Sequence, residues 1–363
     1  MTPLRVVVVM PPATHLDPAA ALELWPTFTK ALEALRASGT IDPVGCCRGE
    51  SIAGVVERHG VQYYFESSDR NLARRVGSLH PAVVHIHGLG FTRLLVAVRR
   101  AVGSDVPILL QHHGEPPPTS ARGRLSRRLT RHMVDGYLFT GAAGQVEPFR
   151  RSGTISSTAS VYEVLESASH LPAGDLDGHA ADVQADIGGN PCVLWVGRLV
   201  SSKDPLCAVR AVAWARDRGS AAELHMLATD RTMEPDVRSL VDSLGADDFV
   251  HIHPPIEHAD MPAWYRRGDV YLSTSHHEGS NYSLIEALGF GCFPVVTSIP
   301  PHAAIVKELA RTFAVGDSDA AGELLLAPAM RSRQEVIGFA HQWLSWATIA
   351  DQLTAIYLRR PRS

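Results

Sequence analysis

Short apolar runs alternate with longer amphipathic stretches along the whole chain. Each run is followed by a polar turn and then by a stretch in which apolar residues recur three and four positions apart, the spacing of one helix face. The pattern predicts strands over 5–9, 43–46, 62–65, 82–87, 106–111, 136–139 and 160–164, and helices over 19–37, 70–79, 91–102 and 124–134. Strands that alternate with helices pair in parallel and are covered on both faces. The first part of the chain is therefore predicted to form a parallel α/β sheet.

The alternation stops over 167–190, where small, polar and turn-forming residues show no sustained period, and then begins again. The second series predicts strands over 192–196, 223–227, 250–253, 270–273 and 293–297, and helices over 203–218, 234–244, 261–267 and 282–289. We therefore expect two doubly wound, Rossmann-like domains, residues 1–166 and 191–342, joined by a linker over 167–190. Ligands of such sheets bind at the carboxyl ends of the strands, so two facing sheets would share a central cleft.

A last helix is predicted over 339–358, with Trp343, Trp346, Ile349, Leu353 and Ile356 at helical spacing. An apolar stripe of this length needs a surface to pack on. The first domain is the candidate surface for the end of the chain, about residues 343–363.

Length and composition agree with two folded domains and limit the possible partners. The chain has 363 residues, of which 45% are hydrophobic and 20% charged, and its formal net charge is -4. Such a charge provides no global positive field, which argues against a nucleic-acid partner and allows at most peripheral membrane contact. No apolar stretch approaches the length of a membrane span, and the five cysteines lack zinc-knuckle or redox spacing. These features predict a cytoplasmic protein.

The segment 275–297, SHHEGSNYSLIEALGFGCFPVVT, contains the strongest candidate site. A strand ends before it, Gly279 allows backbone to approach a ligand closely, and a helix begins near Asn281 or Tyr282. The backbone N–H groups of 280–283 (Ser280, Asn281, Tyr282 and Ser283) would then form an anion site at a helix start, with phosphate as the natural guest. The alternative is that Ser280 or Asn281 simply caps the helix.

Two carboxylates make the phosphate interpretation more specific. Glu278 precedes the helix and Glu286 lies on its first turns, with its side chain leaning back toward the amino end. A carboxylate beside a polyanion is tolerated where it accepts hydrogen bonds from neutral hydroxyl groups, and sugars supply these. The pair suggests a sugar nucleotide. The alternative is that Glu286 is a solvated helix residue and Glu278 a loop charge.

A second element, VLWVGRLVSSKDP over 193–205, places Gly197, Arg198 and Lys203 just beyond a strand. Two cations five residues apart could reach one diphosphate from the same side. At an effective dielectric near 20, a charge about 4 Å away contributes roughly 4 kcal/mol, enough to matter as a phosphate leaves. Alone the motif is weak, because a lysine near a helix start is commonly a surface residue.

Together GRLVSSKDP and EGSNYSLIEALGFGCFPVV resemble the retaining glycosyltransferases of family 4, which have the GT-B fold of two Rossmann-like domains. Glu278 and Glu286, with seven residues between them, match the E-x7-E motif of that family. The resemblance covers most of the second domain and, more loosely, the first. Two departures from the family pattern are Pro11-Pro12 in place of a glycine-rich first turn, and Ala228-Thr229-Asp230 in place of Gly-x-Gly.

The resemblance implies roles for these residues. Arg198 and Lys203 would hold the donor diphosphate, Glu286 the ribose, and Glu278 with the backbone of 279–282 the sugar. The loop 253–256, ending at Ile256, corresponds to the one that lines the base pocket. It also implies that the final helix returns to the first domain and that the reaction requires no metal ion.

Two histidine segments mark strand ends in the first domain, VHIHG over 84–88 and QHHGE over 111–115. His85 and His87 alternate on one strand and could imitate a metal pair, but the sequence places no third ligand, so zinc is discounted. By resemblance, one of these segments touches the sugar or acceptor, and His87 and His113 are the candidates. A structural role is the alternative for each of them.

A basic run over 122–132 has helical spacing and is interpreted as a solvated face, with an anionic acceptor or a lipid surface as the alternative.

These observations predict a retaining hexosyltransferase that moves a sugar from a nucleoside diphosphate sugar to a small-molecule, glycan or lipid-linked acceptor, without cofactor or metal. The rival hypotheses are a nucleotide-sugar epimerase or hydrolase on the same scaffold, and a non-catalytic sugar-nucleotide-binding partner protein. The sequence leaves open the donor base, the sugar and the acceptor.

Overall fold

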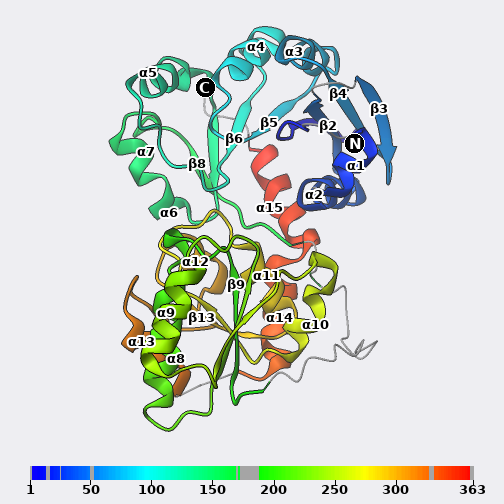
Figure 1. Ribbon diagram of the computed structural model, residues 1–363. Coiled ribbons are helices and arrows are strands. Elements are labelled where there is room, and N and C mark those ends of the chain that lie inside the picture. The colour runs from blue at the N-terminus through cyan, green and yellow to red at the C-terminus, as the bar shows by residue number, and fades with distance from the viewer. Residues whose placement is uncertain are drawn as a thin grey trace. The chain divides into compact units, whose positions relative to one another are not determined.

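A computed structural model describes residues 2–13, 17–24, 26–49, 53–168, 171, 188–326 and 331–359 (Figure 1). Contacts between Cα atoms divide the chain into two compact units. The first comprises Met1–Ser169 with Trp346–Ser363, and the second His170–Ser345. Most of the predicted linker, residues 169–170 and 172–187, lies outside the described residues.

The first unit is built on an eight-stranded sheet of order β3-β4-β2-β1-β5-β6-β7-β8. The strands are β1 (Leu4–Val9), β2 (Ile41–Arg48), β3 (Gly54–Arg58), β4 (Val61–Glu66), β5 (Val83–His87), β6 (Ile108–Gln111), β7 (Gly136–Phe139) and β8 (Val161–Glu163). All of the strand pairs are parallel except β3 with β4. The strand order reverses between β1 and β5.

The antiparallel edge strand β3 was not predicted. It joins β4 through His59 and Gly60, both with positive φ (49° and 75°), as a tight two-residue hairpin turn requires. Its residues alternate between half-buried and exposed, because the strand lies at the edge of the sheet. A short, half-solvated strand has too weak an apolar signal to stand out in the sequence.

The helices of the first unit are α1 (Pro18–Leu24), α2 (Pro26–Ala37), α3 (Asp69–Ser78), α4 (Thr92–Val102), α5 (Ala121–Thr130), α6 (Ala142–Gln145), α7 (Glu147–Arg151) and α15 (Trp346–Tyr357), with a 3-10 turn over Arg131–Met133. The predicted helix 19–37 corresponds to α1 and α2, and residue 25 between them lies outside the described residues.

The predicted helix 339–358 is also two helices, α14 (Arg333–Leu344) in the second unit and α15 in the first. They are separated at Ser345, whose ψ of 151° is extended rather than helical. Ile349, Leu353 and Ile356 are buried on α15, as their spacing predicted, and α15 packs against α2. Trp343 is instead partly exposed on α14, with the Lys307 ammonium 4.7 Å from its ring centre.

The second unit is built on a six-stranded parallel sheet of order β11-β10-β9-β12-β13-β14, and the order reverses between β9 and β12 (Figure 1). The strands are β9 (Cys192–Gly197), β10 (Glu223–Ala228), β11 (Val250–His253), β12 (Val270–Ser273), β13 (Phe293–Thr297) and β14 (Thr312–Phe313). The helices are α8 (Pro205–Arg216), α9 (Glu234–Leu244), α10 (Met261–Arg267), α11 (Tyr282–Gly289), α12 (Pro300–Val306), α13 (Ser318–Leu326) and α14. Short 3-10 turns cover Ser201–Lys203 and His258–Asp260.

Each sheet has an apolar core on its helix-covered faces. In the second unit, buried residues of α8, α9 and α13 pack against β9, β10, β12 and β13. In the first unit, α3 and α4 pack on the central strands. Two Rossmann-like sheets are thereby confirmed as the fold class. Among the described residues, no helix is long and apolar enough to cross a bilayer.

Candidate functional site

The strand order of the second unit reverses between β9 and β12, and this is where an open parallel sheet offers a ligand crevice. The loop after β9 carries Arg198 and Lys203, and the loop after β12 carries Glu278 and the start of α11. The two sequence motifs therefore leave the sheet side by side at the carboxyl ends of paired strands.

Hydrogen bonds join these two loops. The Thr274 hydroxyl lies 2.8 Å from the carbonyl oxygens of both Lys203 and Asp204, and the His276 N–H donates to the Ser202 carbonyl at 2.9 Å. The 3-10 turn that carries Lys203 is thus fixed to the segment after β12. Lys203 precedes α8 rather than lying in it, because Asp204 caps that helix in a left-handed conformation (φ 46°).

The hydrogen bonds between the two loops hold Lys203 beside Glu278, and this pair is the central contact of the candidate site. Lys203 Nζ donates to Glu278 Oε1 at 2.5 Å, and the Ser275 hydroxyl donates to the same oxygen at 2.7 Å. Only 17% of the Lys203 side chain and 9% of the Glu278 side chain are exposed. A pair so shielded from water interacts more strongly than a surface ion pair, and either partner left alone would carry a desolvation penalty.

The start of α11 is fixed from inside the unit by Asn281. This residue has φ 49°, and its side-chain oxygen accepts from the Leu284 N–H at 3.2 Å and from the Tyr271 hydroxyl at 3.1 Å. Its amide nitrogen contacts His302 Nε2 at 2.8 Å and Ser273 Oγ at 3.3 Å. The side chain is therefore used as a helix cap and an interior anchor, which was the alternative interpretation from the sequence.

His302 supports this anchor from α12. Burial lowers the pKa of His302 to about 4, so the ring is neutral at neutral pH. Its Nδ1 lies 3.0 Å from the Thr297 carbonyl, which fixes a proton there and leaves Nε2 to accept from Asn281. The sequence carried no signal for this residue, because a lone histidine near a helix start is not distinctive.

The residues around Asn281 line the turn that enters α11. Ser280 is buried, Gly279 and Ser283 belong to the same turn and first helical residues, and Tyr282 opens the helix with 38% of its surface exposed. These residues lie next to Glu278, at the carboxyl end of the sheet. The predicted proximity of a helix start to a carboxylate and a cation is therefore present in the fold.

Glu286 is buried in α11, where the sequence predicted a solvated residue as the alternative. Its carboxylate accepts from the Tyr265 hydroxyl at 3.1 Å and lies 3.2 Å from His258 Nε2. The hydrogen bond to Glu286 raises the pKa of His258 above its usual value of 6.5. His258, from the loop after β11, thus binds Glu286 more strongly when its ring is protonated.

A pH-dependent contribution to stability follows from this pair. Because the folded-state pKa of His258 lies above its unfolded value, its stabilisation is fully present below the unfolded pKa and is lost as the pH rises through the folded pKa. We expect His258→Gln to lower the free energy of unfolding more at pH ~5.5 than at pH ~8.5. Urea unfolding of both proteins at both pH values measures this, and an equal difference at the two values would contradict it.

Arg198 follows β9 directly and is exposed. It lies near Asp230 in the loop after β10, whose pKa is lowered first by hydrogen bonds from Thr232 and further by the positive charge of Arg198. The two loops are joined where the Leu199 N–H donates to the Asp230 carbonyl at 2.7 Å. Ile256, the predicted base-pocket residue, lies half-buried in the loop after β11.

The first unit places the two histidine segments at adjacent strand ends, after β5 and β6. His87 Nδ1 lies 2.8 Å from His113 Nε2, and His113 Nδ1 lies 3.2 Å from Glu166 Oε1. The Gln111 amide donates to the same Glu166 oxygen at 2.7 Å. The sequence reasoning missed Glu166, because its neighbours in space lie 55 residues away along the chain.

His87, His113 and Glu166 form what we call the histidine relay. The charges of its two imidazole rings follow from their surroundings. Burial lowers the pKa of His87 well below its usual value. Burial also opposes protonation of His113, but the Glu166 carboxylate outweighs it, and the net pKa of His113 is raised. A carboxylate, an imidazole of raised pKa and a neutral imidazole thus form a hydrogen-bonded chain. Such a chain can hold or pass a proton.

The basic run forms α5 and the 3-10 turn after it, and several of its arginines donate to backbone carbonyls at the surface. Arg124 donates to the Thr119 carbonyl at 2.5 Å, Arg128 to the Ser152 carbonyl at 2.7 Å and Arg131 to the Gly153 carbonyl at 2.9 Å. No residue of α5 is buried, which agrees with the interpretation as a solvated face. Arg128 and Arg131 join the helix to the turn after α7.

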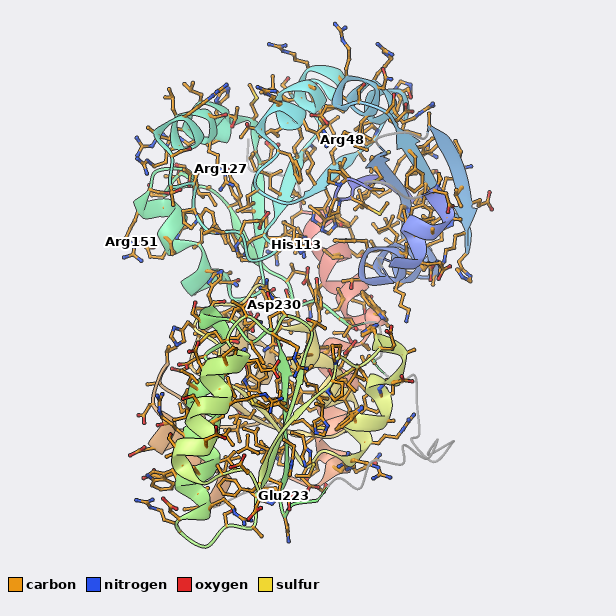
Figure 2. The ribbon with its side chains drawn as sticks, in the orientation of Figure 1. Arg48, His113, Arg127, Arg151, Glu223 and Asp230 are labelled. Carbon is orange, nitrogen blue, oxygen red and sulfur yellow. The ribbon has the colours of Figure 1, made fainter. Side chains whose placement is uncertain are left out.

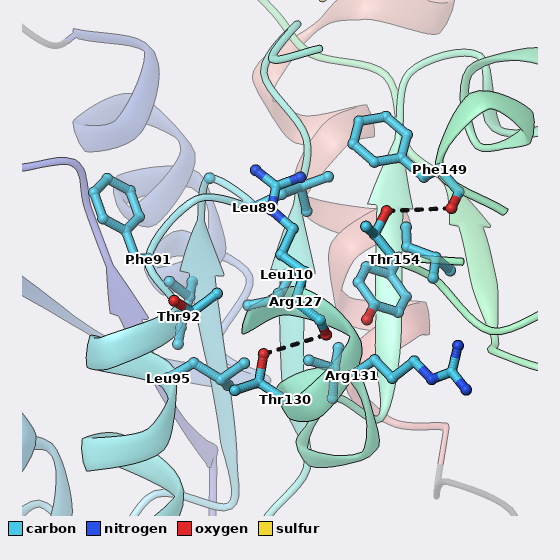
Figure 3. Close-up of a pocket in the computed structure, with 15 residues that line it drawn as sticks. Leu89, Phe91, Thr92, Leu95, Leu110, Arg127, Thr130, Arg131, Phe149 and Thr154 are labelled. Carbon is cyan, nitrogen blue, oxygen red and sulfur yellow. Dashed lines mark hydrogen bonds between the residues drawn. The ribbon is translucent and has the colours of Figure 1, made fainter. Parts of the chain in front are cut away.

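Beside this helix is a hollow lined mainly by apolar side chains (Figure 3). Figure 3 shows Leu89, Phe91, Leu95 and Leu110 around it, with Arg127 reaching in from α5. The Arg127 guanidinium lies 5.9 Å from the centre of the Phe149 ring. This hollow is separate from the histidine relay, whose members do not line it.

Comparison with known proteins shows which family the second unit is similar to. Residues 190–327 match the family model described as glycosyl transferases group 1. The chain is 30% identical over 110 residues to a D-inositol 3-phosphate glycosyltransferase of Arthrobacter sp. (strain FB24), covering 30% of this chain and 26% of that protein. It is 28% identical over 173 residues to the protein of that name from Xylanimonas cellulosilytica, covering 48% and 36%.

Among solved structures, sucrose-phosphate synthase from Thermosynechococcus elongatus matches with a TM-score of 0.67 at 15% identity, covering 98% of each chain. At that identity the match shows the GT-B fold class alone. The chain spans well under half the length of the two curated relatives. Residues 190–327, the segment that contains Arg198, Lys203, Glu278 and Glu286, are thus similar to the family described as glycosyl transferases group 1.

Proposed function

We propose that the chain is a retaining glycosyltransferase that uses a nucleoside diphosphate sugar as donor. The observation that carries the proposal is the shielded Lys203–Glu278 pair at the strand-order reversal of the second sheet, within the segment that matches the family. A cation and a carboxylate held together at the carboxyl edge of a parallel sheet suit a ligand with both phosphate and hydroxyl groups.

In this proposal Lys203 and Arg198 hold the donor diphosphate from the loop after β9. The start of α11, with Gly197 on the neighbouring strand end, brings backbone close to the phosphates. The 2.5 Å contact of Lys203 with Glu278 supports this placement, because a diphosphate would draw the ammonium toward itself without moving the braced 3-10 turn. When the donor binds, the contact of the Lys203 ammonium with Glu278 is then replaced by a contact with the diphosphate.

In this proposal, Glu278 and Glu286 bind hydroxyl groups of the donor. Glu286 binds the ribose, Glu278 with the backbone of 279–282 and the Ser283 region binds the transferred sugar, and Ile256 contacts the base. The burial of Glu286 and its bonds to Tyr265 and His258 support a positioning of this kind, since its rotamer is fixed before any ligand binds.

The reaction is then mainly electrostatic. As the bond from sugar to diphosphate breaks, positive charge develops on the sugar and negative charge on the leaving phosphate, which Arg198 and Lys203 stabilise. The acceptor hydroxyl attacks from the side that the phosphate leaves and gives its proton to the leaving phosphate oxygen, so the configuration at the sugar is retained. The His87–His113–Glu166 relay of the first unit is proposed to contact the acceptor or sugar, and the steps as written need no metal ion.

Donor binding provides the direct test. Thermal unfolding is measured with UDP, GDP and ADP and with their glucose derivatives, in wild type and in Arg198→Ala. A ligand at 100 times its dissociation constant adds about 2.7 kcal/mol to stability. One base series should stabilise the wild type and stabilise Arg198→Ala much less. Lack of stabilisation by every nucleotide would overturn the proposal.

Turnover identifies the reaction class. With the donor found above, release of the nucleoside diphosphate is measured alone and with acceptors, among them D-inositol 3-phosphate, which the curated relatives are named for. Release that requires an acceptor supports transfer. Release without one indicates the rival hydrolase, and epimerised donor indicates the rival epimerase.

Replacement of Glu286 tests the ribose contact. We expect Glu286→Gln to raise the KM for the donor about tenfold to 100-fold with little change in kcat, because a hydrogen bond to a charged group contributes about 1.5–3 kcal/mol. The matched control is Glu323→Gln, a carboxylate on the outer helix α13. A KM unchanged in Glu286→Gln would remove the residue from the donor site.

A further inference from the structure

Beyond the donor site, the second unit carries three histidines and a glutamate on two neighbouring strands. Glu223 and His225 alternate on β10, and His251 and His253 alternate on β11, so the members of each pair share a face of the sheet. The strands are parallel, with His225 opposite His251, which puts all four side chains on the same face. Since β11 is the last strand of the sheet, the four side chains lie near the edge of the sheet.

Three of these side chains converge. Glu223 Oε2 lies 3.3 Å from His251 Nε2 and 4.0 Å from His225 Nε2. The ligand atoms of Glu223, His225 and His251 all lie within 4.8 Å of one another. The rings of His225 and His251 stack with centres 4.9 Å apart and planes 30° from parallel, so their edges point to the same place.

The second nitrogen of His225 has its own partner. His225 Nδ1 lies 3.0 Å from His253 Nε2, and the His253 ring is held in turn by the edge of Trp264, at 4.5 Å between ring centres. With a metal ion on Nε2, His225 would carry its proton on Nδ1, and this N–H would donate to His253 Nε2. A hydrogen bond of this kind to the far nitrogen commonly orients histidine ligands of metals.

The backbone at Gly188 covers the cluster closely. Its carbonyl oxygen lies 3.3 Å from His225 Nε2, and a Cβ at this position would lie 2.8 Å from Glu223 Oε2. A Cβ at Gly189 would lie 2.8 Å from the Glu223 backbone nitrogen. Only glycine lets the chain pass here, directly before β9, without displacing the carboxylate.

We propose that Glu223, His225 and His251 bind one divalent first-row transition-metal ion, with Zn²⁺ as the reference ion. Two imidazoles and one carboxylate with a position left for water form a ligand set that zinc accepts. Tetrahedral bonds of about 2.0–2.1 Å separate ligand atoms by about 3.3 Å. The Glu223–His251 separation already has this value, the Glu223–His225 separation is 4.0 Å, and all three ligand atoms lie within 4.8 Å of one another, so rotations of the side chains would bring the set to it.

This site is distinct from the donor site. Glu223 begins β10 and Asp230 follows its carboxyl end, and Figure 2 shows the two residues at opposite ends of the second unit. A strand of this length spans about 16 Å. The ion would join the edge strand β11 to β10 and to the backbone that enters β9. Its role is stabilisation of the fold, and it rests on none of the contacts assigned to the donor.

Other metal-binding groups offer little competition in the folded protein. Among the described residues, Glu223, His225 and His251 are the one group of three or more candidate ligands whose atoms converge in this way. The five cysteines are buried, and burial raises the pKa of the Cys47, Cys192, Cys207 and Cys292 thiols to about 12. A single binding event is therefore expected.

The test is titration calorimetry of the full chain with Zn²⁺ after removal of metals with EDTA. Wild type should bind one Zn²⁺ per chain, and the ion should raise the midpoint of thermal unfolding. Glu223→Gln and His251→Ala should each weaken binding at least tenfold. Both sites are partly exposed, with 26% and 34% of the side chain accessible, so the variants are expected to fold, and circular dichroism in EDTA checks this.

His253 is assigned as a positioning residue and has its own readout. His253→Ala should weaken Zn²⁺ binding, and His253→Gln, which keeps an acceptor for His225 Nδ1–H, should restore part of the affinity. His341→Ala on α14 is the matched control and should bind as wild type does. The proposal is overturned if wild type shows no saturable binding, if Glu223→Gln and His251→Ala both bind as wild type, or if His341→Ala weakens binding as much as they do.

Discussion

Replacing Lys203 by alanine is expected to lower kcat/KM at least ~100-fold, a loss of about 2.7 kcal/mol in transition-state stabilisation. In the proposed reaction, Lys203 lies beside the leaving diphosphate, where a charge about 4 Å away is worth roughly 4 kcal/mol at an effective dielectric near 20. The loss should fall mainly on kcat, because negative charge on the phosphate grows as the bond breaks.

The same substitution has a structural component, because Glu278 would keep only the Ser275 hydroxyl among the two donors described above. Lys203→Arg separates the two effects, since it keeps the positive charge beside Glu278 while changing its shape. It should retain stability and recover part of the activity. Release of the nucleoside diphosphate measures turnover, and urea unfolding measures stability.

Arg210→Ala is the matched control, because Arg210 is an exposed cation on α8, the helix that follows Lys203. It should react as wild type does. If Lys203→Ala is folded and turns over at the wild-type rate, the diphosphate does not lie beside Lys203 and the proposed donor site is wrong.

Replacing Asn281 by alanine is expected to lower the free energy of unfolding by about 3–5 kcal/mol. Loss of a helix cap costs about 1 kcal/mol. The Tyr271 hydroxyl would keep Ser283 as a partner, whereas His302 Nε2 would lose a buried one, and a buried polar group left unpaired costs about 1–3 kcal/mol. Alanine must also adopt the left-handed backbone at φ 49°, which adds about 1 kcal/mol.

Two further variants resolve these contributions, all measured by urea unfolding followed by tryptophan fluorescence. Asn281→Gly should be about 1 kcal/mol more stable than Asn281→Ala, since glycine adopts the left-handed backbone without strain. Asn71→Ala, on the first unit's α3, is a surface asparagine control and should change stability by less than about 0.5 kcal/mol. A loss below about 1 kcal/mol in Asn281→Ala would show that the anchor is not needed.

The sequence predicted most elements of both sheets, because apolar residues recur with different periods in strands and in helices. Each period can be recognised within a short segment of the chain. The strands Val250–His253, Val270–Ser273 and Phe293–Thr297 and the helices Glu234–Leu244 and Tyr282–Gly289 match their predicted bounds. Local chemistry also pointed to the loops after β9 and β12, where a glycine, cations and acids follow buried strands. Among the elements that were missed, β3 is a short edge strand, and α13 buries Ala321, Gly322 and Leu325, a mostly small set that gives a weak apolar signal.

What the sequence determined by itself is the alternation of strands and helices and the two motifs that follow their ends. The tertiary structure decided which strands are neighbours, and hence that Lys203 meets Glu278 across 75 residues, that Glu286 is buried against Tyr265 and that His225 lies opposite His251. These pairings depend on strand order and register, which follow from the packing of whole faces rather than from any local pattern.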